Sequence, residues 1–262
     1  MGTELVLYET RYPAAIITLN CPQTRNALSM PMVDAIMAAL QRAQHDSGVR
    51  ALIVTGTESA FSAGMDLKEL RRALDEMSFD QSGGALWADA FRGEELIDRL
   101  YRFPKPTIAA VNGAAAAAGA ALVSACDMAV AVPEARIGYP EMRRGIQAGM
   151  VLIHLMRLVG ERHARFLVLT GELITAGRAR EIGLLNEVVA RDQLMATAMQ
   201  WAASVALNAP KAEMITKALL EKFSAQAVSM KTVEYKEAPH LTDECRAGLE
   251  AFFQKRPAPW TL

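Results

Sequence analysis

Residues 107 to 126 read TIAAVNGAAAAAGAALVSAC, a stretch without a charged side chain. The run Thr107 to Val111 is β-branched and apolar, which predicts a buried strand. Asn112-Gly113 ends this strand, and Ala115 to Cys126 predicts a helix of small residues. A buried strand followed at once by a helix is the basic unit of an α/β fold. The stretch therefore predicts α/β architecture with unusually close packing.

A transmembrane helix is the competing interpretation of this stretch, because about 20 apolar residues can span a bilayer. Alanine and glycine are weakly hydrophobic, Pro104 and Pro106 precede the stretch, and Asp127 follows it. We therefore expect no membrane association. Glu4 lies near the N-terminus and no basic-then-apolar run follows, so we expect no leader peptide and a cytoplasmic location.

On both sides of this stretch, short apolar strands alternate with helices over most of the chain, which supports the α/β prediction. Ser29 is placed to cap a helix that has Pro31 in its first turn. The segment 78–85 predicts a mobile loop. After about Asp192 the strand signal ends and a helical layer is expected. Strands are predicted at 5–8, 16–20, 51–55 and 128–132, and helices at 29–44, 67–77, 87–101, 194–208, 211–223 and 242–254.

The composition excludes several classes of protein. Of 262 residues, 52% are hydrophobic and 22% charged, which is typical of a globular chain. Lysine plus arginine is 28 against 29 acids, and aromatics are 6%, so neither a phosphate-neutralising surplus nor a base-stacking platform is present. We expect no nucleic-acid partner. Three cysteines and four histidines, without ligand spacing, predict no metal site.

Familiar catalytic motifs are absent, but two turns of small residues can expose backbone N–H groups. The sequence has no G-x-S-x-G, no phosphate-binding P-loop and no G-x-G-x-x-G. The turn Phe61 to Asp66 enters a helix, and Asn112 to Gly119 is a second strand-to-helix transition of small residues. N–H groups at two such helix starts can form an oxyanion hole. Tight helix packing alone is the alternative explanation of the small residues.

Five motifs together resemble the crotonase family, the enoyl-CoA hydratase/isomerase superfamily. Their order and spacing match along nearly the whole chain, from Leu5 to Pro257. The motifs are Asn20-Cys-Pro-Gln-Thr-Arg-Asn-Ala-Leu28, Phe61-Ser-Ala-Gly-Met-Asp-Leu67, Lys105-Pro-Thr-Ile-Ala-Ala-Val-Asn-Gly113, Cys126-Asp127 and Tyr139-Pro-Glu141.

The resemblance implies a ClpP/crotonase spiral of ββα turns over residues 1–191, containing an acyl-CoA site. It implies a C-terminal helical trimerisation region over residues 192–262, and hence a homotrimer or a dimer of trimers. The expected partner is an acyl-CoA thioester. The expected enzyme needs no metal or separate cofactor, because CoA is part of the substrate.

The resemblance also implies where the thioester binds. The two backbone donors of the oxyanion hole fall on Met65 and Ala118. The family's glycine triplet is here Ala117-Ala118-Gly119, a departure that leaves a backbone donor in place. Arg25 and Lys68 are candidates for CoA phosphates, with solvated surface charge as the alternative. The residues expected to contact substrate or CoA are Arg25, Ala27, Ala63, Met65, Asp66, Leu67, Lys68 and Ala118.

Glu141 is the expected catalytic base. Typical family hydratases hold one water between two glutamates, and the first of these positions is here Ala121. Burial of a lone Glu141 would raise its pKa toward the range of a general base. One carboxylate suffices to move a proton from C2 of a 3-enoyl-CoA to C4. The sequence therefore favours isomerisation to the 2-enoyl-CoA.

Two alternatives stay open. A 2-enoyl-CoA hydratase would need an acid from another turn, and Arg143 and Arg144 are either surface charges or partners of a substrate group. A crotonase-fold protein that binds CoA without catalysis is the other alternative. The acids that lie between the first loop and Lys105 are Asp75, Asp80, Asp89, Glu94, Glu95 and Asp98.

Overall fold

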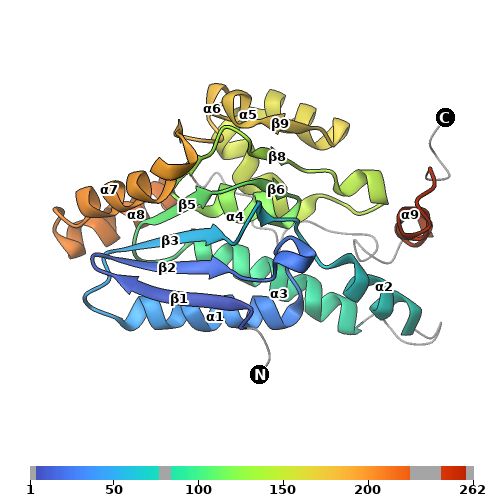
Figure 1. Ribbon diagram of the computed structural model, residues 1–262, viewed down its shortest axis with the longest axis horizontal. Helices are drawn as coiled ribbons and strands as arrows, with labels where there is room; N and C mark the ends of the chain where they lie inside the picture. The colour runs from blue at the N-terminus through green and yellow to red at the C-terminus, as the bar shows by residue number, and fades with distance from the viewer. Residues whose placement is uncertain (1–3, 77–83, 225–242, 258–262) are drawn as a thin grey trace.

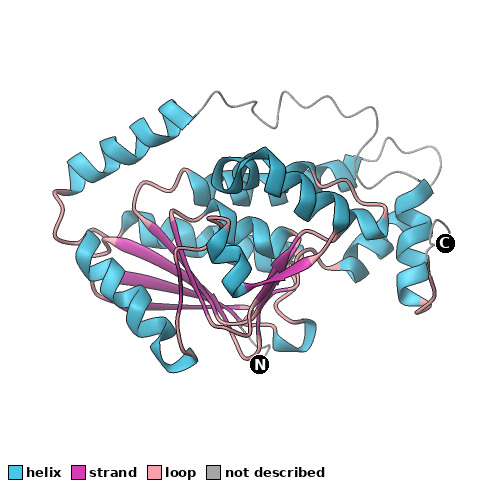
Figure 2. Ribbon diagram, turned by 90° about the horizontal axis from the view of Figure 1, so that it is seen from above, coloured by secondary structure: helices cyan, strands magenta, loops and turns pink. Residues whose placement is uncertain are grey.

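The computed structural model describes residues 4–76, 84–224 and 243–257. Within them the strands form two sheets, with helices around both (Figures 1 and 2). In the larger sheet β1 is antiparallel to β2 and the other neighbours are parallel. Its strands in spatial order are β1 (Val6–Arg11), β2 (Ala14–Leu19), β3 (Ala51–Gly56), β5 (Thr107–Val111), β7 (Met128–Ala131) and β10 (Glu187–Val188).

The smaller sheet takes the next strand after each of three strands of the larger one. The chain passes from β3 to β4, from β5 to β6 and from β7 to β8, so each turn contributes one strand to each sheet. This alternation is the spiral of ββα turns expected from the sequence. The smaller sheet contains β4 (Ala60–Ser62), β6 (Ala114–Ala116), β8 (Arg136–Gly138) and β9 (Leu173–Thr175).

Helices cover the sheets and bury their apolar faces. Ser29 caps α1 by accepting a hydrogen bond from Met32 N–H at 3.3 Å, as predicted, and α1 lies below β1 and β2 in Figure 1. The helices are α1 (Met30–His45), α2 (Leu67–Glu76), α3 (Gly84–Tyr101), α4 (Ala118–Ala125), α5 (Gly149–Thr170), α6 (Ala176–Glu181), α7 (Leu194–Val205), α8 (Pro210–Ser224) and α9 (Asp243–Phe253), with 3-10 turns η1 (Pro22–Thr24), η2 (Glu141–Arg144) and η3 (Arg191–Gln193).

The C-terminal helices contact different parts of the core. α7 packs against β3, β5 and β7, whereas α9 packs against α2 and η2. α8 is tied to the large sheet by an ion pair of 2.6 Å from Lys217 to Asp127, which also accepts from the N–H and hydroxyl of Thr107. The Cys126-Asp127 motif therefore joins the starts of β5 and β7 to α8.

The sequence predictions missed the three strands that bring the site together. Phe61 and Ser62 were expected in a loop but belong to β4, and no strand was expected at β8. The helix expected at 115–126 is divided into β6 and α4, because Ala114 to Ala116 pair with strands on both sides. Small residues let the three neighbouring strands approach closely. A strand of three residues is too short to show a periodic pattern in the sequence. The predicted mobile loop at 78–85 falls largely outside the described residues, and α3 begins at Gly84. In the described ranges, no helix combines the length and hydropathy of a membrane span.

Candidate active site

Three adjacent parallel strands of the smaller sheet bring the predicted catalytic segments to one edge. β4 pairs with β6, and β6 pairs with β8, with Ala116 opposite Gly138. Met65, Ala118 and Glu141 each follow the carboxyl end of one of these strands by two or three residues. The carboxyl ends of parallel strands are where α/β proteins bind ligands. The sheet therefore gathers residues that are far apart in the sequence.

The main chain of Met65 is oriented by a parallel bridge to Leu28. Leu28 N–H donates to Gly64 O at 2.7 Å, and Asp66 N–H donates to Leu28 O at 3.2 Å. A residue between two such bonded groups directs its own N–H to the opposite side. The Met65 N–H thus points away from Leu28, and no group in the described ranges accepts from it.

Ala118 is the first residue of α4, so its N–H is one of the four that a helix start leaves without an internal acceptor. Gly64 brings the first loop against this helix start. It has φ of +88°, and a Cβ added there would lie 2.7 Å from Ala116 O and 3.2 Å from Ala118 N. Only glycine fits this contact. The two predicted donors therefore flank one small region.

Ala117 connects β6 to α4 in an unusual backbone conformation. Its φ is 53° and its ψ is −125°, a region that side chains with a Cβ rarely adopt. Its N–H donates to Gly138 O at 2.9 Å, and its carbonyl accepts from Ala121 N–H at 2.9 Å. These bonds hold the turn that presents Ala118 N–H.

Two buried asparagines join the two loops. The sequence alone predicted no role for either of them. Asn26 Nδ2 donates to Ala60 O at 2.9 Å, and Asn112 Nδ2 donates to the same oxygen at 3.1 Å. Ser62 Oγ donates to Asn26 O at 2.8 Å and accepts from Gly64 N–H at 3.2 Å. Both asparagines lie within the recognised motifs, and this was the only sequence signal for them. Their hydrogen bonds position the loops.

Glu141 lies at the start of η2 and is 9% exposed. Its Oε2 atom is buried and has no hydrogen-bond partner among the described residues. Burial raises the pKa of Glu141 to about 7, while a hydrogen bond from its own backbone N–H and the charge of Arg144 act in the opposite direction. The sequence-based expectation of a raised pKa agrees with this environment. At neutral pH the carboxyl group exchanges protons readily.

Arg143 and Arg144, the last residues of η2, have different surroundings. Exposed Arg143 donates to Thr170 O from Nε at 3.2 Å and from Nη2 at 2.9 Å. Arg144 is half-buried, donates from Nη1 to Pro140 O at 3.2 Å, and lies over the Phe252 ring at 4.8 Å. Its Nε atom is buried without a protein partner, and burial lowers its pKa from the ordinary value.

The residues predicted to contact substrate or CoA differ in their exposure to solvent. Ala27 is buried, Met65, Asp66, Leu67 and Ala118 are half-buried, and Arg25, Ala63 and Lys68 are exposed. Asp66 caps the start of α2, where its Oδ1 accepts from Lys68 N–H at 2.9 Å. The exposure of Arg25 and Lys68 leaves both explanations open, phosphate contacts and solvated surface charge.

The positions considered for a second acid differ in their surroundings within the described ranges. Ala121 is fully buried in α4. Asp75 is exposed and paired with Arg71, and Asp98 is exposed and paired with Arg102. Glu94 and Glu95 belong to α3, Asp80 lies outside the described residues, and nothing is described of the Asp89 side chain. The same ranges contain no cluster of three metal-ligating side chains.

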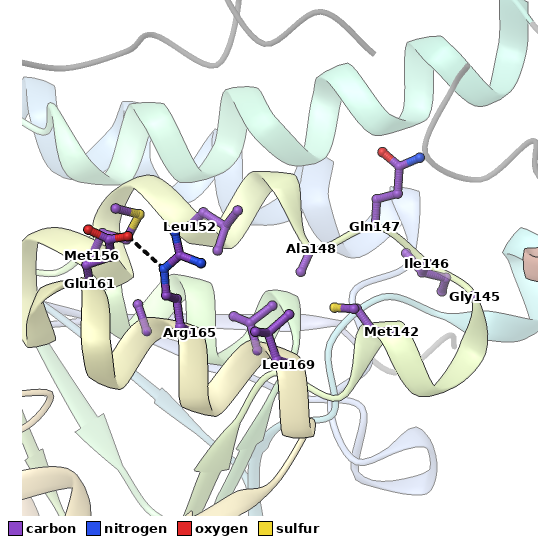
Figure 3. Close-up of a pocket in the computed structure, with 12 residues that line it drawn as sticks. Met142, Gly145, Ile146, Gln147, Ala148, Leu152, Met156, Glu161, Arg165 and Leu169 are labelled. Atoms are coloured by element: carbon purple, nitrogen blue, oxygen red, sulfur yellow. Dashed lines mark hydrogen bonds and ion pairs between the residues drawn. The ribbon is translucent and has the colours of Figure 1, made fainter. Parts of the chain in front are cut away.

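A cavity of about 470 Å³ lies behind η2, between the two halves of α5 (Figure 3). Met142, Ile146 and Ala148 lie at one end, and the ion pair between Glu161 and Arg165 lies at the other. A break at Gly160, with φ of 71°, separates the two halves of the helix. The cavity borders the segment after Glu141 but is not lined by the predicted backbone donors.

An α/β spiral that places two free backbone donors and a buried carboxyl group at one sheet edge defines a class of fold suited to carbonyl chemistry. The chain belongs to the enoyl-CoA hydratase/isomerase family, whose model matches residues 10–262. The resemblance found in the sequence and the crotonase-like α/β fold are both confirmed.

Relatives and solved structures match over nearly their whole length. A protein of Thermus thermophilus, provisionally named enoyl-CoA hydratase, is 38% identical, with 93% of this chain and 95% of the relative covered. The 2,3-dehydroadipyl-CoA hydratase of Escherichia coli is 34% identical, with 92% of each covered. The crystal structure of an enoyl-CoA hydratase/isomerase from Xanthobacter autotrophicus has a TM-score of 0.79 at 33% identity, covering 98% of this chain and 100% of the other.

Proposed function

We propose that this protein binds an enoyl-CoA thioester and moves a proton at its C2 atom. The thioester oxygen would accept hydrogen bonds from the Met65 and Ala118 N–H groups, which stabilise the negative charge that develops on it. Glu141 would act as the base. The observation that carries this proposal is a buried carboxylate oxygen without a protein partner, at the same sheet edge as the two donors.

Hydration of a 2-enoyl-CoA is the reaction we propose. Glu141 takes a proton from water while the water oxygen bonds to C3, and the C2–C3 π electrons move toward the thioester oxygen. The enolate then takes the same proton from Glu141 at C2. The product is a 3-hydroxyacyl-CoA, and Glu141 returns to its carboxylate form. One carboxyl group thus serves as base and then as acid.

The names of the relatives support hydration over the isomerisation favoured by the sequence. The 34% identical Escherichia coli protein is named a hydratase of a 2,3-unsaturated acyl-CoA, and the 38% identical Thermus protein also carries a hydratase name. A pKa of about 7 lets Glu141 both accept and return a proton near neutral pH. The names of the relatives favour the addition of water, whereas the raised pKa serves hydration and isomerisation equally.

Isomerisation of a 3-enoyl-CoA is the second candidate, because Ala121 supplies no second acid. Here Glu141 removes a proton from C2 and returns it to C4, while the double bond moves from C3–C4 to C2–C3. This reaction needs the same hole and the same base but no bound water.

The test is to assay 2-enoyl-CoA and 3-enoyl-CoA esters of several chain lengths with wild type and Glu141→Gln. We expect hydration by the wild type and a loss of about 10²–10⁴-fold in the variant, the range for a positioned base. Turnover of 3-enoyl-CoA alone would select isomerisation. Tight CoA-ester binding without turnover of either substrate would instead identify a non-catalytic binding protein.

CoA itself is expected to lie along the first loop in this proposal. Arg25 and Lys68 would contact its phosphates, and Ala27, Ala63, Asp66 and Leu67 would border the pantetheine. The reaction proposed needs no metal or additional cofactor, and we propose that it takes place in the cytoplasm.

A further inference from the structure

The turn η2 carries a donor and an acceptor that are both buried and both without a hydrogen-bond partner in the part of the chain that the structure describes. The acceptor is Glu141 Oε2 and the donor is Arg144 Nε. Glu141 is the first residue of η2 and Arg144 the last, three positions later. A 3-10 helix has three residues per turn, so the two side chains leave the same face of η2.

The two groups do not satisfy each other. No ion pair within 4.0 Å joins Glu141 and Arg144, although the Arg144 charge is near enough to lower the pKa of Glu141. Arg144 is held elsewhere, by Pro140 O and by the Phe252 ring. The contact with Phe252 means that α9 helps to keep the guanidinium away from the carboxylate.

The chemistry of the missing partner follows from the two atoms. A single group that serves both atoms accepts a hydrogen bond from Arg144 Nε–H and donates one to Glu141 Oε2. A carboxylate or a carbonyl oxygen accepts but does not donate, and an ammonium group donates but does not accept. Water and the hydroxyl group of an alcohol do both.

Resting on the proposed hydration, we propose that Arg144 and Glu141 together bind the water that adds to C3, and that Arg144 replaces the acid missing at Ala121. In the reverse reaction the same pair binds the 3-hydroxyl group of the product. Arg144 orients the water oxygen by its N–H and takes no proton. Glu141 still removes the proton from water and delivers it to C2, so the atoms balance as in the proposed reaction.

The experiment separates water binding from proton transfer. Wild type, Arg144→Gln, Arg144→Lys and the control Arg143→Gln are assayed in two reactions. The first is hydration of 2-butenoyl-CoA. The second is exchange of the C2 hydrogens of butanoyl-CoA with D₂O, which needs the hole and Glu141 but adds no water. Arg143→Gln removes a neighbouring charge and an anchor of η2.

We expect Arg144→Gln and Arg144→Lys to lower the kcat of hydration about 100-fold, a typical effect of one positioned donor. Exchange at C2 should stay within about threefold of wild type, and Arg143→Gln should change both rates less than threefold, the scale of a rim charge. The lysine variant keeps the charge but lacks the Nε–H, so it tests the donor itself.

Two results would overturn the role of Arg144 but leave the proposed function standing. One is an equal loss of hydration and exchange, which would show that Arg144 only supports Glu141 or the fold. The other is hydration at the wild-type rate in Arg144→Lys or Arg144→Gln. A wild type that exchanges C2 hydrogens but hydrates no 2-enoyl-CoA overturns the proposed function itself. The three results are distinguishable in one set of assays.

Discussion

The carboxyl group of Glu141 is only partly ionised at neutral pH, because its surroundings favour the protonated form. Its folded-state pKa of about 7 lies above the ordinary value of 4.5 because burial removes the carboxylate from water. The folded chain therefore binds more protons than the unfolded chain between these two values. The contribution of Glu141 to the unfolding free energy is greatest below pH 4.5 and is lost as the pH rises to about 7.

We predict that Glu141→Gln is more stable than wild type at pH 8 by roughly 3 kcal/mol, since each pKa unit corresponds to about 1.4 kcal/mol. The difference in unfolding free energy should shrink toward pH 5, because Glu141 of the wild type is then more protonated in both the folded and the unfolded state. Urea unfolding at the two pH values measures it. A difference independent of pH would show that Glu141 does not have a raised pKa.

At the scale of elements, the first turn of α4 depends on an alanine held in a glycine-like conformation. Ala117 has φ of 53°, and such a residue typically stores about 1–3 kcal/mol of strain. We predict that Ala117→Gly raises the unfolding free energy by about 1 kcal/mol, after the entropy of glycine in the unfolded chain is subtracted. Ala120→Gly, inside the same helix, is the matched control and should lose about 1 kcal/mol. Denaturant unfolding of both variants tests this, and a loss in Ala117→Gly would contradict it.

Sequence patterns predicted elements where the signal is local. The apolar run Thr107 to Val111 became β5, and Ser29 caps α1 as expected. β6 was missed because three alanines fit a helix as well as a strand, and the choice depends on partners about fifty residues before and twenty after. Glu141 and the two loops were found through the family resemblance.

The contacts that hold the candidate site in place could not be predicted from local sequence patterns, for the same reason. The convergence of Asn26 and Asn112 on Ala60 O joins three separate segments. The unpartnered Nε of Arg144 depends on Phe252, more than a hundred residues later. Neither contact leaves a spacing that a single sequence can show.

At the scale of the whole molecule, α8 presents an apolar surface to solvent. Its exposed side chains are Met214, Ile215, Leu219 and Leu220, and the helix lies at the periphery of the described chain (Figure 2). Contiguous exposed apolar surface is typical of a subunit interface. Together with the family resemblance, this favours a homotrimer or a dimer of trimers, formed through residues 192–262.

We therefore predict a solution mass of three or six chains by light scattering at micromolar concentration. The double variant Ile215→Glu/Leu220→Glu should shift the mass to that of one chain, because two charges cannot be buried unpaired at an interface. Lys211→Glu, a charge change on the same helix, serves as the control. A wild-type monomer, or an assembly unaffected by the double variant, would contradict the assignment.

The contact of Gly64 with Ala116 and Ala118 has a consequence for how this protein can evolve. Because both candidate donors are main-chain groups, almost any side chain can be exchanged around them without removing an N–H. The vulnerable changes are a proline at position 65 or 118, or a side chain at position 64, 113 or 119, where backbone atoms leave no room for a Cβ. Related chains can therefore differ in their loop side chains while keeping the same two main-chain N–H groups, and a comparison of residue letters alone underestimates what they share.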